Sequence, residues 1–193
     1  MKRYVIFAGV NGAGKTTLYQ TNENIKKLLR VNVDEIVRDF GSWENFSDVA
    51  TAGRKAVALI NDYFSKGMSF NQETTLCGKS ILRNIRRAKE LQYRVELYFV
   101  GLESPNLAKE RVRQRVKAGG HGVPEKDIER RYFESLKNLV EIMPLCDHVE
   151  LYDNTETFRQ IATFEFGNCV DKDEQVPLWC SKLISKNLCG FNR

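Results

Sequence analysis

The sequence predicts an α/β fold in which a five-stranded parallel sheet carries helices on both faces. Short apolar runs, the first at residues 4–8, alternate with longer segments of helical spacing, the clearest at residues 47–66. Strands separated by helices are joined by crossover connections, so they lie parallel. A glycine-rich turn follows the first apolar run directly and leads into a helical segment. A chain of 193 residues is expected to form one domain over residues 1–193.

The expected elements follow one another in a regular order. Strands are expected at residues 4–8, 31–33, 68–72, 93–100 and 147–152, with an edge strand at 161–170. Helices are expected at residues 16–30, 47–66, 80–91, 105–119 and 124–143. Ser104 before Pro105 is a typical helix start, and Gly67 is a typical stop. A C-terminal extension over about residues 155–193 is expected to carry a docked helix at 178–188.

Composition and charge exclude several classes of protein. Apolar residues make up 42% of the chain and charged residues 28%, the balance of a globular protein with a substantial core. No apolar run approaches the roughly 18 residues of a membrane span, and the N-terminal run is too short for a signal peptide. The net charge of +5 suits anionic substrates but does not by itself indicate nucleic acid. The five cysteines include no CxxC pair, so we expect reduced thiols in a cytoplasmic protein without a membrane partner.

Residues 9–16 match the phosphate-binding pattern GxxxxGK[ST], directly after the first strand and at the start of a helix. Glycines let successive backbone N–H groups face one point, and the helix N-terminus adds partial positive charge there. Lys15 is suited to the β- and γ-phosphates of a nucleotide, and the Thr16 hydroxyl is a ligand for Mg²⁺. The sequence therefore predicts a P-loop NTPase fold that uses ATP and Mg²⁺. The residues expected to contact ATP are Gly9, Asn11, Gly12, Ala13, Gly14, Lys15, Thr16 and Thr17.

The P-loop alone leaves the phosphate acceptor open. Water as the acceptor makes an NTPase, a substrate hydroxyl makes a kinase, and coupling to a partner's motion makes a switch or a motor. The chain is too short for motors and transporter ATPases, and it lacks the NKxD-type motif with which GTPases read the base. Residues 75–79 (TLCGK) are similar to a transporter signature loop, but no Walker B strand follows closely, so we interpret that similarity as accidental.

Acidic residues stand at the ends of the second and third expected strands, where ligands of parallel sheets gather. The carboxylate of Asp34 would accept the proton of an acceptor hydroxyl, the alternative being that Asp34 caps a helix. Glu73 would bind Mg²⁺ through water or hold the acceptor together with Thr74, the alternative being a solvated strand end. Arg54 would grip an anionic acceptor, unless it is an ordinary exposed helix arginine.

Residues 105–140 are expected to form a helical lid in which a glycine hinge joins two arginine-rich helices. Closing such a lid excludes water and brings guanidinium groups to the transferred phosphate. Arg111 and Arg115 share a helix face, whereas Arg113 points elsewhere, and any one of them could instead be solvated. His121 in the hinge is either a plain loop residue or a lid contact. No His, Cys and Asp grouping has metal-ligand spacing, so Mg²⁺ is the one metal expected.

Five segments together resemble the zeta-toxin family of P-loop kinases, in its branch of short bacterial proteins. They are GVNGAGKTT (9–17), VNVDEI (31–36), SFNQETTLCGKS (69–80), GLESPNLAKERVRQRVKAGGHGVPE (101–125) and IERRYFESLKNL (128–139). Their order and spacing are specific, and together they cover most of residues 3–153. The chain beyond about residue 155 is not covered by the resemblance.

The resemblance implies an ATP-dependent phosphotransferase, and the best-known members of the family phosphorylate UDP-N-acetylglucosamine on its sugar. It implies that Lys15 and Thr16 hold ATP and Mg²⁺, and that Asp34 activates the acceptor hydroxyl. Glu73 would lie in the acceptor or metal shell, and Arg111 would be a lid arginine. A second lid arginine before Pro124 is not evident, so either Arg115 or His121 supplies that contact. Analogy with small kinases implies the strand order 2-3-1-4-5, and a toxin would be paired with a small antitoxin protein that blocks its ATP site.

Three hypotheses remain open from the sequence. The first is transfer of the γ-phosphate of ATP to a hydroxyl of a small molecule, such as a nucleotide sugar. The second keeps the same ATP residues but takes a dinucleotide, an antibiotic or a polynucleotide end, in a different pocket between Phe40 and Arg54. The third is a non-enzymatic ATP-binding module, and the intact set Lys15, Thr16, Asp34 and Glu73 counts against it.

Overall fold

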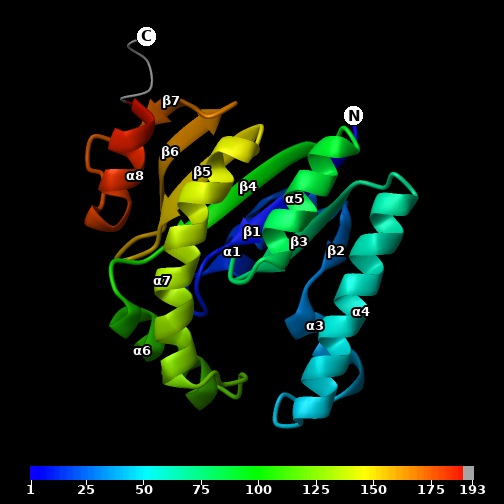
Figure 1. The fold of residues 1–193 in the computed structure, drawn as a ribbon. Helices are drawn as coiled ribbons and strands as arrows, with labels where there is room; N and C mark the ends of the chain where they lie inside the picture. The colour runs from blue at the N-terminus through cyan, green and yellow to red at the C-terminus, as the bar shows by residue number, and fades with distance from the viewer. Residues whose placement is uncertain (189–193) are drawn as a thin grey trace.

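A seven-stranded sheet with the order β2-β3-β1-β4-β5-β6-β7 forms the centre of the computed structural model, which describes residues 1–188 (Figure 1). Its parallel strands are β1 (Arg3–Ala8), β2 (Leu29–Val31), β3 (Phe70–Thr74), β4 (Arg94–Gly101) and β5 (His148–Asp153). Two antiparallel strands, β6 (Arg159–Glu165) and β7 (Asn168–Lys172), extend the sheet beyond β5. The predicted P-loop kinase-like fold with its parallel order 2-3-1-4-5 is confirmed.

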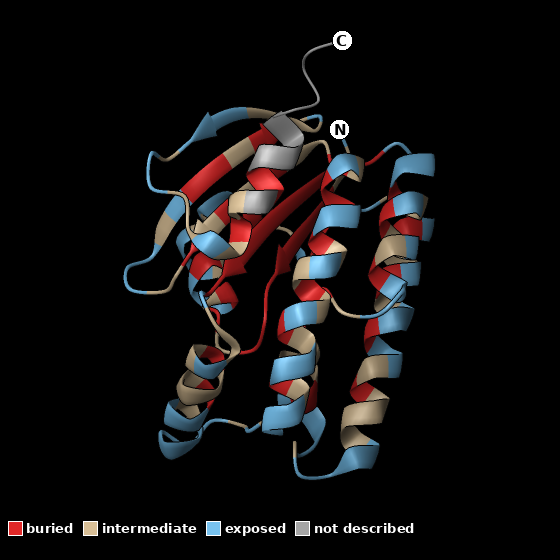
Figure 2. Ribbon diagram, turned by 60° about the vertical axis from the view of Figure 1, so that its left-hand side comes forward, coloured by how far each residue is buried: buried red, intermediate tan, exposed pale blue. Residues whose placement is uncertain are grey.

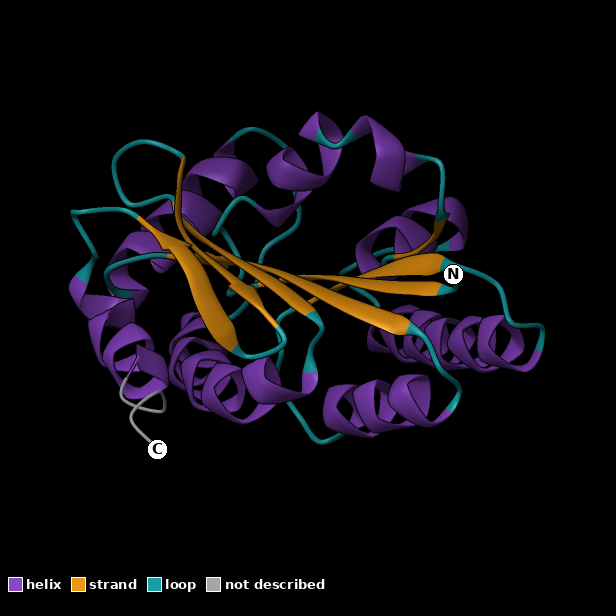
Figure 3. Cartoon of the chain, turned by 90° about the horizontal axis from the view of Figure 1, so that it is seen from above, coloured by secondary structure: helices purple, strands orange, loops and turns teal. Residues whose placement is uncertain are grey.

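Helices cover both faces of the sheet (Figure 3). One face carries α4 (Phe46–Ser65), α5 (Ser80–Glu90), the end of α7 (Glu125–Ile142) with the 3-10 turn η1 (Met143–Leu145), and α8 (Leu178–Leu188). The other carries α1 (Lys15–Thr21), α2 (Glu23–Lys26), α6 (Pro105–Lys117) and the beginning of α7. The remaining helix, α3 (Val33–Phe40), packs along α4.

The alternating direction of side chains along the central strands explains why the protein has two hydrophobic cores. In β1, Tyr4 and Ile6 belong to the core under α4 and α5, whereas Val5 and Phe7 belong to the core under α1 and α6. Successive side chains of a strand point to opposite faces, so a strand buried on both faces is apolar throughout. The central strands are accordingly the most buried part of the molecule, whereas exposed residues lie on the outer helix surfaces, in the loops and on the edge strand β7 (Figure 2).

The structure corrects two expected elements. The single helix expected at residues 16–30 is broken at Asn22, which ends α1 and caps α2 by accepting a hydrogen bond from the Ile25 N–H at 3.1 Å. The edge strand expected at 161–170 is instead a hairpin of β6 and β7. Phe166 and Gly167 both have positive φ, 50° and 81°, which suits a two-residue hairpin turn.

The C-terminal helix predicted for residues 178–188 is present and docked. Cys180 and Ile184 of α8 are buried in the core beside Phe99, and the Trp179 indole N–H donates to Asp153 Oδ1 at 2.9 Å. Cys77, Cys146, Cys169 and Cys180 are free thiols, as expected, whereas Cys189 lies outside the described residues. Among the helices described, none combines the length and apolar character needed to cross a membrane.

His148 lies between two carboxylates at the start of β5, and its removal should show in the pH dependence of stability. Its Nε2 is 2.9 Å from Glu150 Oε1 and its Nδ1 is 2.7 Å from Glu165 Oε1. The hydrogen bond to Glu150, opposed by burial and helped by Glu165, raises the pKa of His148. Because this pKa is higher in the folded than in the unfolded protein, the protonated imidazole stabilises the fold. The stabilisation is fully present below about pH 6.5, the pKa of an unfolded-state histidine, and it is lost as the pH rises through the pKa of the folded state.

We therefore expect His148→Gln to lower the free energy of unfolding more at pH 6 than at pH 9. Each partly exposed ion pair contributes roughly 0.2–1 kcal/mol, so the difference should be of that order. Urea denaturation of both proteins at the two pH values measures it. An equal loss at both pH values would mean that the imidazole contributes packing rather than charge.

Candidate functional site

The glycine-rich loop lies at the carboxyl end of β1 and runs into α1. A Cβ on Gly9 would stand 2.3 Å from the carbonyl oxygen of Val100, so only glycine allows β4 to pass this closely. Gly14, the residue before α1, has φ +103°, a left-handed conformation that glycine adopts without strain. No side chain caps α1, so the amides of its first turn keep the free donors that anions bind at helix N-termini.

Lys15 is the cation of this loop and is nearly buried, with 9% of the residue exposed. Its Nζ donates to the Val10 carbonyl oxygen at 3.2 Å. Burial lowers the pKa of the Lys15 ammonium, against the opposing influence of the Glu73 and Asp34 carboxylates. In the described part of the chain no carboxylate lies within ion-pair distance of Nζ, so a phosphate is the partner that would neutralise the charge.

Thr16 and Glu73 face each other across the mouth of the loop. The Thr16 hydroxyl is 3.2 and 3.3 Å from the two carboxylate oxygens of Glu73. A hydroxyl and a carboxylate are hard oxygen donors, and Mg²⁺ is held by one or two such groups together with phosphates and water. Among the described residues no group of three His, Cys, Asp or Glu side chains could hold a metal alone. The site therefore fits a Mg²⁺ ion that is bound jointly by the protein and a nucleotide.

Arg30 and Asn32, which the sequence analysis did not single out, hold Glu73 in place. Arg30 Nη2 is 2.6 Å from Glu73 Oε2, and both side chains are almost buried. Asn32 Nδ2 donates to the same oxygen at 3.1 Å, and its Oδ1 caps α3. The Arg30 guanidinium also stacks on the Tyr19 ring at 3.6 Å. β2 lies beside β3 with Arg30 opposite Asn71, which explains why residues so far apart in sequence meet.

We expect Arg30→Met to destabilise the protein by about 3 kcal/mol, because it leaves the Glu73 carboxylate buried without its cation. The double variant Arg30→Met/Glu73→Gln should recover most of that loss, since the buried Glu73 charge is then gone and Glu35, the other carboxylate paired with Arg30, is 40% exposed. Urea denaturation of the two variants provides the comparison. Arg86→Met, on the exposed face of α5, is the control and should change stability by less than about 0.5 kcal/mol. A double variant no more stable than Arg30→Met would contradict the charge argument.

Asp34 lies in the first turn of α3, two residues after its cap, so the cap is Asn32 and not Asp34. Its Oδ2 is 3.2 Å from Nε2 of His121, in the hinge between α6 and α7. Burial alone would raise the pKa of the Asp34 carboxyl, but the hydrogen bond and charge of His121, with the charges of Lys15 and Arg115, hold it below its usual value. Asp34 is therefore ionised at neutral pH and free to accept a proton.

The arginines of the lid segment, residues 105–140, differ in what they contact. Arg111 packs over Gly12, and its Nη2 donates to the Thr155 carbonyl oxygen at 3.1 Å. Arg115 Nε donates to the His121 carbonyl oxygen at 3.1 Å, while its buried Nη2 has no hydrogen-bond partner among the described residues. Arg131 of α7 reaches the P-loop itself, with Nη1 3.0 Å from Asn11 Oδ1. Arg131 therefore hydrogen-bonds to the P-loop directly, and the sequence analysis did not select it.

Most of these groups line one cavity of about 490 Å³ at the carboxyl ends of β1 and β3. Its lining includes Asn11, Lys15, Asn32, Asp34, Trp43, Glu73, Thr74 and Arg131. Thr74 also accepts a hydrogen bond from the Leu76 N–H at 3.1 Å. Arg54 is not part of this lining: it is exposed on α4 and donates to Thr51 Oγ1 at 2.8 Å. The structure thus brings Lys15, Asp34, Glu73 and Thr74 together in one cavity, with Thr16 beside Glu73. The other predicted site residues outside the P-loop do not line it: Arg54, Arg111, Arg115 and His121.

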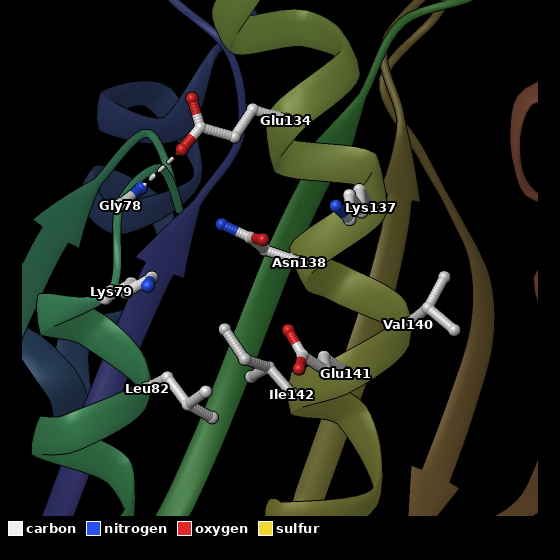
Figure 4. Close-up of a pocket in the computed structure, with 9 residues that line it drawn as sticks. All are labelled: Gly78, Lys79, Leu82, Glu134, Lys137, Asn138, Val140, Glu141 and Ile142. Carbon is white, nitrogen blue, oxygen red and sulfur yellow. Dashed lines mark hydrogen bonds between the residues drawn. The ribbon is translucent and has the colours of Figure 1, made fainter.

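A larger cavity of about 820 Å³ lies between α5 and α7 (Figure 4). Gly78, at the start of α5, donates its N–H to Glu134 Oε1 at 2.7 Å, and Asn138 donates to the Leu76 carbonyl oxygen at 2.8 Å. Two of its polar side chains, Glu134 and Asn138, are thus engaged with the backbone, and no P-loop residue lines it. We therefore assign the candidate active site to the smaller cavity.

Comparison with known proteins agrees with this arrangement. The Zeta toxin family profile matches residues 2–164. An uncharacterized protein of Haemophilus influenzae (strain ATCC 51907 / DSM 11121 / KW20 / Rd) is 30% identical over 128 residues, which cover 66% of this chain and 91% of that protein.

Three solved structures share the fold at low sequence identity. A chain of the AvrRxo1-ORF1:-ORF2 complex with ATP has a TM-score of 0.72 at 16% identity, over 96% of this chain and 63% of that chain. A chain of the PezAT chromosomal toxin–antitoxin system of Streptococcus pneumoniae has a TM-score of 0.59 at 13% identity, over 98% and 84%. A chain of the Pnkp1/Rnl/Hen1 RNA repair complex has a TM-score of 0.58 at 17% identity, over 72% of this chain and 46% of that chain. This chain spans less than two thirds of the length of the AvrRxo1 chain that it matches. With a family profile that covers most of its length, the chain belongs to the zeta toxin family of P-loop proteins.

Proposed function

We propose that the protein is an ATP-dependent kinase that transfers the γ-phosphate of ATP to a hydroxyl of a small molecule. The observation that carries the proposal is the convergence of four charged groups on one cavity: the Lys15 ammonium, the Asp34 carboxylate, the Glu73 carboxylate and the Arg131 guanidinium. Phosphoryl transfer needs a positioned acceptor, a proton acceptor and stabilisation of the charge that spreads over the transferred group. A module that only binds nucleotide has no need of Asp34 in this cavity.

Each residue has a separate role in this proposal. The amides of residues 9–16 and the Lys15 ammonium bind the phosphates of ATP. Thr16 and Glu73 hold Mg²⁺, which when bound neutralises charge on the β- and γ-phosphates. Asp34 accepts the proton of the acceptor hydroxyl, and Arg131 stabilises the charge on the transferred phosphoryl group.

The acceptor is proposed to be small and anionic. A cavity of about 490 Å³ is in the range of sites for small ligands. The net charge of +5 favours an anionic acceptor. A nucleotide sugar such as UDP-N-acetylglucosamine satisfies both conditions and is the first acceptor to test. The AvrRxo1 chain was crystallised with ORF2 and PezAT is a toxin–antitoxin system, so we also propose a protein partner that covers the ATP loop.

The test is a transfer assay with γ-labelled ATP and Mg²⁺ against nucleotide sugars, dinucleotides, aminoglycoside-type antibiotics and RNA 5′-hydroxyl ends. The proposal expects label on a small-molecule acceptor with the wild-type protein and none with Lys15→Ala. Label on RNA ends alone would replace the small-molecule acceptor by a polynucleotide end. ATP binding without transfer to any acceptor, or with release of free phosphate alone, would refute the kinase.

A further inference from the structure

Two segments far apart in sequence meet above Asp34. Trp43 lies in the loop between α3 and α4, and His121 lies in the hinge between α6 and α7. Their rings are stacked, with centroids 4.0 Å apart and planes 14° from parallel. The His121 side chain is only 11% exposed although it belongs to a glycine-rich loop. An imidazole held this flat and this deep is part of a defined contact rather than a freely moving loop residue.

His121 is held by three contacts. Trp43 covers one face of its imidazole, Asp34 Oδ2 lies 3.2 Å from Nε2 of the ring, and the backbone carbonyl oxygen of His121 accepts a hydrogen bond from Arg115 Nε at 3.1 Å. Arg115 in turn lies against Gly120, where a Cβ would stand 2.6 Å from the arginine side chain, so the hinge needs glycine there. The ring therefore presents Nε2 to the carboxylate in one orientation.

The stacked pair also separates two cavities. Trp43 lines both the candidate active-site cavity and an outer cavity of about 880 Å³, Asp34 lines the inner one, and His121 lines the outer one. The contact of Asp34 Oδ2 with the fixed imidazole leaves the second oxygen of Asp34 for the inner cavity. The imidazole also favours the ionised carboxylate, the form that can accept a proton.

We propose that His121, held by Trp43, is a positioning residue that aims the Asp34 carboxylate at the acceptor and keeps it ionised. This inference rests on the kinase proposed above and extends it by two residues that do not touch the reacting atoms. It also gives the lid hinge a function, because the hinge must be folded over the α3–α4 loop for Asp34 to be oriented.

Other charged groups around the two cavities are kept constant in the test. Lys15 of α1 and Arg115 of α6 lower the pKa of Asp34, Glu73 of β3 and Arg131 of α7 line the inner cavity with it, and Arg38 and Glu44 line the outer cavity. None of them is altered in the variants chosen, so a change at Asp34 reports on the stacked pair.

The experiment compares wild type with His121→Ala, Trp43→Leu and His121→Gln, with Val116→Ala as the control. Val116 lines the outer cavity but is not part of the stacked pair. The Asp34 carboxyl is titrated by ¹³C NMR in each full-length protein, and kcat and KM are measured against pH with the best acceptor. Thermal unfolding confirms that each variant is folded.

The proposal expects His121→Ala and Trp43→Leu to raise the pKa of Asp34 and to move the acid limb of kcat to higher pH. At neutral pH kcat should fall by about 10- to 100-fold, the usual cost of a misplaced catalytic group, while KM for ATP stays within about twofold. His121→Gln, which keeps an N–H donor, should recover part of kcat, and Val116→Ala should match wild type.

An unchanged Asp34 pKa in His121→Ala, or an unchanged kcat in both ring variants, would overturn the proposal. If His121→Ala changes the pKa of Asp34 and kcat but Trp43→Leu does not, Trp43 has no part in positioning Asp34. The titration needs no turnover, so it separates this inference from the proposed function: a wild-type protein that transfers phosphate to no acceptor refutes the kinase, while the pKa of Asp34 still decides whether His121 controls that carboxylate.

Discussion

Replacing Arg131 with alanine is expected to slow phosphoryl transfer by about 10³- to 10⁵-fold, the range for loss of an arginine that stabilises the transferred phosphoryl group. Arg131 Nη1 already contacts the P-loop at Asn11 Oδ1, so its guanidinium stands beside the place where the terminal phosphate of ATP would lie. ATP affinity should change far less, because the loop amides and Lys15 remain. Single-turnover transfer from γ-labelled ATP measures the rate, and calorimetry measures the affinity.

Two variants make this result specific to the position of Arg131. Arg113→Ala removes an exposed lid arginine whose guanidinium is bonded to Glu110 and Glu125, and its rate should stay close to wild type. Arg131→Lys keeps the positive charge but loses the planar fork of donors, so it should restore only part of the rate. Wild-type activity in Arg131→Ala, or a full loss in Arg115→Ala alone, would transfer the role to Arg115, whose Nη2 is buried without a partner among the described residues.

Arg131 is an example of a site residue that a local sequence pattern can indicate. Arg130 and Arg131 are adjacent in sequence, and both belong to an evident helix. The buried residues Ile128, Tyr132 and Ser135 mark the inward face of α7, and Arg131 lies three residues after the first and four before the last. Arg130 instead bonds Asp127 and Glu134 on the outer face. Helical periodicity therefore indicates Arg131, whereas the glycine hinge favours Arg111 and Arg115.

Other features depend on contacts that no local pattern records. The P-loop and the approach of Asp34 and Glu73 follow from motif spacing and strand ends, and the parallel strand order follows from the analogy with small kinases, so these features could be predicted. Arg30 meets Glu73 only because β2 pairs with β3, and Trp43 meets His121 only because two loops converge. The sequence indicates one edge strand at residues 161–170 rather than the β6–β7 hairpin, because the hairpin turn begins with Phe166, a residue type that rarely adopts positive φ. Gly167 after it was the available turn signal.

The substitution Asp34→Asn is expected to reduce kcat by about 10²- to 10⁴-fold, the usual contribution of a positioned proton acceptor. Asparagine keeps the size of the side chain and a contact with His121, but its amide cannot take the proton of the acceptor hydroxyl. The pKa of the Asp34 carboxyl is held below its usual value, so wild-type activity should fall only as the solution becomes acidic enough to protonate it. The residual rate of Asp34→Asn should lack that acid limb.

The measurements are kcat against pH with the best acceptor and ATP binding by calorimetry. ATP affinity should stay within about twofold, because Asp34 contacts neither the loop amides nor Lys15 Nζ by any hydrogen bond in the described residues. Asp34→Glu retains a carboxylate but at a different distance from the acceptor, so its kcat should lie between those of wild type and Asp34→Asn. Full activity in Asp34→Asn would remove the carboxylate from the chemistry, and then the His121 contact would act on stability alone. Loss of ATP binding in that variant would instead make Asp34 part of the nucleotide site, and the acceptor cavity would have to be sought elsewhere.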